Sequence, residues 1–178
     1  MDCAWAAGTS CVMGARLSTK EVLLNVLKCL VIFYSLYYVV SSICFAAYRL
    51  DTFDGKIPFD FHTWIDLTQC CNNYTSKQMV NLISMEVTYA VSGLGYSCVS
   101  YHWVWDYSVT TIIIHILLCS AVMLNFPVNW SWWICLGCGL LMQIGLGELV
   151  ALVRQRKKLA RVTLSPEQEP MNFLYRRL

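Results

Sequence analysis

The chain has 178 residues, of which 57% are apolar and only 13% are charged. A soluble domain carries about 25% charged residues, so this composition argues against an ordinary soluble protein. The formal net charge is +2, and seven of the thirteen Lys and Arg residues follow Leu152. This placement is typical of a basic tail beside a membrane rather than of a nucleic-acid groove, and we predict one small membrane domain and no nucleic-acid partner.

Residues 1–27 are predicted to form a cytosolic leader. They contain no Lys or Arg before Arg16, and they lack the basic start and apolar core of a secretory signal peptide. The next segment, about residues 29–48, is a run of twenty residues without a charge. Because about 20 apolar residues are needed to cross a bilayer, we predict that this segment is the first transmembrane helix and that it is not cleaved.

Residues 49–78 form the one long loop of the predicted membrane domain. Gly55 and Pro58 argue against a long helix in this loop. Asn73, Tyr74 and Thr75 make a glycosylation sequon, which can be used only if the loop is lumenal.

Three further helices are predicted at about residues 79–101, 107–126 and 132–153, with Pro127 in the short turn between the last two. The predicted fold class is therefore an all-α membrane protein, a four-helix transmembrane bundle over residues 28–153. Residues 154–178 are predicted to be a basic cytosolic tail. The lipid bilayer is the first partner that this organisation implies.

The distribution of basic residues predicts the orientation of the bundle. Cytosolic segments beside transmembrane helices are enriched in Lys and Arg. This places the C-terminus in the cytosol, and four crossings place the N-terminus there too. The residues that carry this argument at the membrane surface are Arg154, Arg156, Lys157, Lys158 and Arg161.

Polar side chains inside the predicted spans need an explanation, because an ionisable group there costs on the order of 2.5–3.5 kcal/mol. For each of them, packing inside the bundle is one explanation, and contact with a ligand, an ion or a proton is the other. His115 and Glu148 are predicted to lie at similar depth and to contact each other. The residues concerned are Glu86, His115, Gln143 and Glu148.

The sequence contains no nucleophile elbow, zinc-protease motif or phosphate-binding loop, and Asp106 lies in a linker without a second carboxylate. Cys135 and Cys138 have metal-like spacing but no second pair of ligands. We therefore predict no enzymatic activity, no catalytic residue, no metal and no cofactor.

An ordered set of residues between Trp105 and Leu164 resembles the Sys-one family of Golgi trafficking membrane proteins. The segments 28–40, 58–61 and 86–89 are similar to one paralogue within that family. No single motif is specific, but the set is, and the resemblance covers roughly residues 22–164. The residues that carry it are Asp106, Val109, Thr110, His115, Phe126, Pro127, Trp132, Trp133, Gly147 and Glu148.

The resemblance implies a four-helix multi-pass protein of the trans-Golgi network. It also implies a role in vesicle-mediated protein transport, including Golgi-to-endosome traffic, as a receptor that localises an Arf-related small GTPase to the Golgi. No partner-binding residues can be transferred from the family.

Two other functions stay open at the level of sequence. A small ion- or proton-coupled transporter could use Glu86, His115 and Glu148, although no internal repeat or pair of broken helices supports it. A tetraspanin- or claudin-like organiser is the other, although tetraspanins have a large loop where this chain has a short turn.

Overall fold

The structure, a computed structural model, describes residues 18–50, 53–67, 74–100 and 103–164, with side chains described up to residue 160. This part of the chain consists of four α-helices and one short 3-10 helix, and it contains no strand. The all-α prediction is confirmed. The elements are α1 (Thr19–Ala47), η1 (Ile57–Phe59), α2 (Ser76–Val99), α3 (Val104–Met123) and α4 (Trp130–Leu164).

Two of the helices are longer than the predicted spans. α1 begins at Thr19, where the Glu21 carboxylate accepts a hydrogen bond from the Ser18 amide at 2.9 Å and so stabilises the first turn. α4 continues through the basic segment to Leu164 instead of ending at residue 153. The difference arises because charges end a membrane span but not a helix, and Lys, Arg and Glu are good helix formers.

Three of the described helices are long and apolar enough to cross a membrane, namely α1, α3 and α4 over Trp130–Ala160. α2 is more polar, and its most extensive contacts are with α4 and α1. Its buried polar side chains therefore face other helices rather than lipid, which is where polar groups in a membrane are tolerated. These side chains are Asn81, Ser84, Thr88, Ser92 and Ser97.

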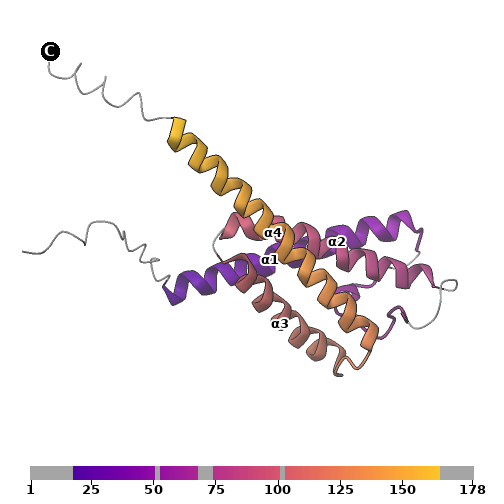
Figure 1. The fold of residues 1–178 in the computed structure, drawn as a ribbon. Coiled ribbons are helices and arrows are strands. Elements are labelled where there is room, and N and C mark those ends of the chain that lie inside the picture. Colours follow the sequence, from indigo (N-terminus) through magenta and orange to yellow (C-terminus); the bar gives the residue numbers. More distant parts are fainter. Residues whose placement is uncertain (1–17, 51–52, 68–73, 101–102, 165–178) are drawn as a thin grey trace, which may run out of the picture.

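The start of α1 and the end of α4 lie at the same end of the bundle, and the last turns of α4 project beyond the other helices (Figure 1). Residues 152–160 are all exposed, in keeping with this projection. The last turns of α4 thus form an exposed, basic helical segment at one end of the bundle.

The described part of the long loop, residues 53–67, packs against the opposite end of the bundle. Ile57, Phe61, Trp64 and Ile65 are buried, and hydrogen bonds tie the loop to the surrounding helices. The Leu67 amide donates to Ser131 Oγ at 3.1 Å, and the Gln78 side chain donates to the Trp64 carbonyl at 3.1 Å. The loop is therefore a structured cap, which its polar sequence did not predict.

Close contact between α2 and α4 sets the centre of the bundle. A Cβ atom on Gly93 would overlap the backbone carbonyl of Gln143, and one on Gly147 would lie 2.9 Å from the Gly93 carbonyl oxygen. A Cβ atom on Gly139 would lie 2.8 Å from the Tyr89 ring. Only glycine fits at these positions, because small residues let two helix backbones approach each other.

Substitution of Gly93 by Leu should therefore destabilise the protein, since the obstructing atoms belong to a helix backbone that cannot move aside. We expect a loss of about 3 kcal/mol in the free energy of unfolding, which thermal unfolding in detergent would measure. Gly145→Leu is the matched control on α4, because nothing lies within 4 Å of a Cβ atom there. Equal losses in the two variants would show that the glycine contact is not the cause.

Candidate functional site

His115 lies on α3 at the centre of an aromatic cluster, which includes Phe59 from the loop of residues 53–67. Its side chain is 1% exposed, and its Nδ1 atom lies 3.1 Å from the Tyr34 hydroxyl. The Cys119 sulfur lies 3.6 Å from Nε2 and 3.8 Å from the Pro58 carbonyl oxygen. The rings of Phe33, Tyr34, Tyr37 and Phe59 surround the imidazole at centroid distances of 5.3 to 6.4 Å.

The predicted contact between His115 and Glu148 is wrong. Gly147, next to Glu148, faces Val104 at the start of α3, and His115 lies eleven residues further along that helix. At 1.5 Å per residue this separation is about 16 Å. Antiparallel helices meet at positions equidistant from the turn that joins them, and Glu148 is much farther from the Pro127 turn than His115 is.

Gln143 and Ser92 form the polar contact at the middle of the bundle. The Gln143 amide donates to Ser92 Oγ at 2.7 Å, and both side chains are fully buried. This bond lies beside the close contact of Gly93 with the Gln143 backbone, so it fixes the same pair of helices in register. The arrangement agrees with a packing role for Gln143.

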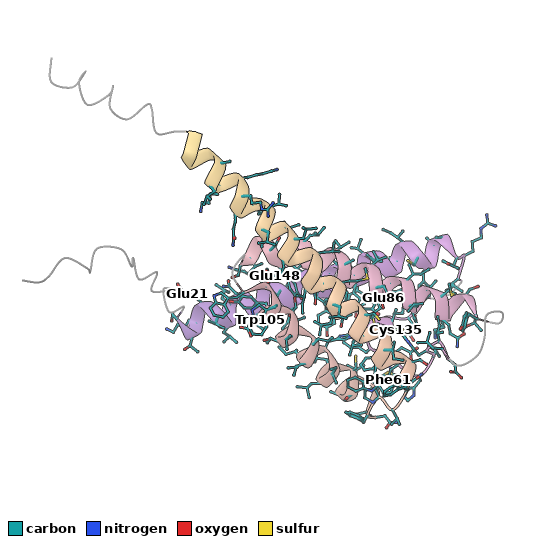
Figure 2. All side chains as sticks on the ribbon, in the orientation of Figure 1. Glu21, Phe61, Glu86, Trp105, Cys135 and Glu148 are labelled. Atoms are coloured by element: carbon teal, nitrogen blue, oxygen red, sulfur yellow. The ribbon has the colours of Figure 1, made fainter. Side chains whose placement is uncertain are left out.

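Glu86 and Glu148 are partly buried and lie toward opposite ends of the bundle, as Figure 2 shows. No hydrogen bond or ion pair joins any two of Glu86, His115 and Glu148, all of which lie within the described residues. The three ionisable residues of the transporter hypothesis therefore do not converge on one site.

Four residues of the family-like motif meet at the turn between α3 and α4. The Trp133 indole donates to the Pro127 carbonyl at 2.9 Å, and the Phe126 ring lies 6.2 Å from the Trp133 ring. Trp132 is buried against Phe61 of the loop, with ring centroids 6.1 Å apart. Trp132 therefore connects the loop to the turn, and the other three residues stabilise the turn itself.

The other motif residues lie near the opposite end of α3. Asp106 is exposed in the first turn of α3, where its charge is favourable for the helix dipole, and Thr110 is half-buried on the next turn. Gly147 permits the contact between α4 and α2 described above. None of these three positions forms a catalytic group with its neighbours.

The structure describes most of the basic residues predicted at the membrane surface, but not the predicted glycosylation site or the two terminal segments. Arg154, Arg156, Lys157 and Lys158 are exposed on α4, and Arg161 lies on the same helix, where side chains are not described. Arg154 also donates to the Ser97 carbonyl at 3.2 Å, at the end of α2. Asn73, residues 1–17 of the leader and residues 165–178 of the tail lie outside the described residues.

Among the described residues, no group of three His, Cys, Asp or Glu side chains is placed to hold a metal ion. The polar groups that are brought together instead join helices to one another or to the loop. The architecture is that of an α-helical integral membrane protein with polar side chains buried between its helices.

Two comparisons with known proteins agree on the family. Residues 16–160 match the SYS1 family, described as integral membrane protein S linking to the trans-Golgi network. A human protein named as transmembrane protein 244 is 38% identical over 127 residues, which cover 70% of this chain and 92% of that protein. The chain belongs to the Sys-one family, as its sequence predicted. No solved structure is a significant match.

A double-mutant cycle on Tyr34 and His115 tests the contact at the centre of the aromatic cluster. We expect Tyr34→Phe and His115→Phe to show a coupling of about 1 kcal/mol in the free energy of unfolding in detergent, because each removes the same partly buried hydrogen bond.

Tyr38→Phe is the control for that cycle. The Tyr38 hydroxyl donates to the Gly55 carbonyl at 2.9 Å and has no hydrogen bond to His115, so its effect should add to that of His115→Phe. Additive effects of Tyr34→Phe and His115→Phe would mean that their hydrogen bond does not stabilise the fold.

Proposed function

We propose that this protein acts in vesicle-mediated protein transport at the trans-Golgi network, as a membrane receptor that localises an Arf-related small GTPase there. The observation that supports this proposal is the family match over residues 16–160, which spans all four helices apart from the last residues of α4. The family is one of integral membrane proteins linked to the trans-Golgi network. Recruitment of a GTPase is the finer step that the resemblance implies.

The receptor proposal includes four membrane crossings with both termini in the cytosol. α2 supplies the fourth crossing because its polar face is covered by α1 and α4 and need not meet lipid. An even number of crossings agrees with the position of the α1 start and the α4 end at one end of the bundle (Figure 1). The basic residues of α4 favour the cytosolic side for that end.

The projecting part of α4 is the surface that we assign to the GTPase. From Arg154 to Leu164 it extends about 15 Å at 1.5 Å per residue, and its described side chains up to residue 160 are exposed. A rigid rod that stands clear of the bundle can contact a peripheral protein without rearrangement of the membrane helices.

Rescue of cells that lack the Sys-one protein tests the receptor role. We expect this chain, tagged at its N-terminus, to mark the trans-Golgi and to return the Arf-related GTPase there, as imaging of both proteins would show. The charge reversal Arg156→Glu with Lys157→Glu should leave the tag in place and reduce GTPase return. A correctly placed tag with a GTPase that stays cytosolic would contradict the receptor proposal.

Selective permeabilisation tests the number of crossings. With only the plasma membrane permeabilised, antibodies should reach tags at both termini, and they should reach a tag inserted after Gly55 only when the Golgi membrane is opened as well. Tags at the two termini on opposite sides would mean that α2 does not cross.

A further inference from the structure

An open groove of about 1000 Å³ runs along the outside of the bundle where α1, α2 and α4 meet. Its walls are apolar over most of their length, with Ile32 and Leu36 from α1 and Val91 and Leu94 from α2. The lining cations, Lys28 and Arg154, are contributed by α1 and α4. The lining of the groove is thus mostly apolar, and Lys28 and Arg154 add positive charge to it.

A second, smaller hollow of about 230 Å³ adjoins this groove. It is lined by Ser97, Cys98, Arg154, Gln155 and Lys158, so the two spaces share Cys98 and Arg154 and form one continuous site. No acidic residue is present among the described residues that line either space. A polar, basic compartment is therefore continuous with an apolar channel.

Arg154 is held at the junction of the two spaces. Its Nη1 atom donates to the Ser97 carbonyl at 3.2 Å, and its Nη2 atom lies 3.1 Å from the Cys98 sulfur. The Ser97 carbonyl belongs to the last turn of α2, where carbonyls have no partner within the helix. Arg154 therefore caps α2 in a fixed position, and most of its N–H donors remain for a ligand.

We propose that this continuous site binds an anionic glycerophospholipid, with its phosphate headgroup at Arg154, Lys28 and Lys158 and an acyl chain along the apolar groove. The charge and the shape together select this occupant. A soluble anion would leave the apolar groove empty, and a neutral lipid would bring no negative charge to a site whose described lining holds cations and no acidic residue. Basic pockets between transmembrane helices commonly hold such headgroups.

This inference goes beyond the receptor function and does not depend on it. It requires only that the bundle is in a membrane, which the family membership establishes. Arg156 and Lys157 are exposed cations on the basic end of α4, and they line neither space. They allow a lipid bound in the site to be distinguished from lipid attracted to a basic helix in general.

Lipid retention by the purified full chain tests the proposal. The protein is reconstituted in vesicles of equimolar phosphatidylcholine and phosphatidylserine, extracted in mild detergent, and analysed for bound lipid by mass spectrometry. We expect phosphatidylserine to be enriched over phosphatidylcholine. Lys28→Gln with Lys158→Gln should lower the enrichment about 25-fold, because each basic residue near a headgroup contributes about fivefold.

Matched variants separate the contributions of charge and groove. Arg156→Gln with Lys157→Gln removes the same charge outside the site and should leave the enrichment unchanged. Leu94→Trp should fill the groove and reduce retention while every cation is kept, since Leu94 is 41% exposed on its wall. Arg154 is left intact because its loss would also uncap α2.

Three outcomes would overturn the proposal. One is the absence of phosphatidylserine enrichment in the unaltered protein, and another is an equal loss in the two charge-pair variants. The third is displacement of the retained lipid by soluble glycerophosphoserine together with full retention by Leu94→Trp, which would describe an anion site without a lipid groove.

Discussion

The close contact between α2 and α4 is the constraint on which the other features of this bundle depend. Gly93 lies against the backbone of Gln143, and Gly147 lies against the carbonyl of Gly93, so the two helices are fixed both in distance and in register. The hydrogen bond from Gln143 to Ser92 lies at the same level. With lipid outside, the hydrophobic effect does not hold helices together, and packing and polar contacts of this kind take its place. The contact also explains how a helix as polar as α2 can belong to a membrane domain.

The same register determines what lies at the two ends of the molecule. At one end, residues 53–67 close the bundle, and Trp132 packs against Phe61 of this cap, while Trp133 donates to the Pro127 carbonyl within the adjoining turn. At the other end, Arg154 reaches the last turn of α2 and leaves a basic, open site beside it. One end is therefore sealed by aromatic packing, and the other is accessible and positively charged.

Three of the helices, α1, α3 and α4, could be predicted from their long apolar runs, but the partner of each helix in the bundle could not be predicted. The contact between His115 and Glu148 was predicted wrongly because the depth of each residue was counted from one membrane face. In antiparallel packing, residues meet when they are equally distant from the connecting turn. Residues 49–78 were predicted only to be a loop without a long helix, yet Asp54 and Asp60 accept hydrogen bonds from loop amides, while Phe61 and Trp64 are buried. The polar and apolar residues of this loop follow no regular period that would reveal which of them are buried. Gly147 belongs to the set of residues that carries the family resemblance, but its contact with Gly93 of α2 depends on the packing of the whole bundle.

The position of Arg154 connects the fold to the proposed activities. It lies where α4 leaves the bundle, and it binds the end of α2, so the direction of the projecting helix is tied to the membrane helices rather than free. A ligand at Arg154 would contact the base of that rod, α2 and, through Lys28, α1. Lipid bound there would hold three helices together at the end to which we assign the proposed peripheral partner. The stability of the rod would then depend on the composition of the membrane around it, and a receptor built this way would present its surface most rigidly in membranes rich in anionic lipid.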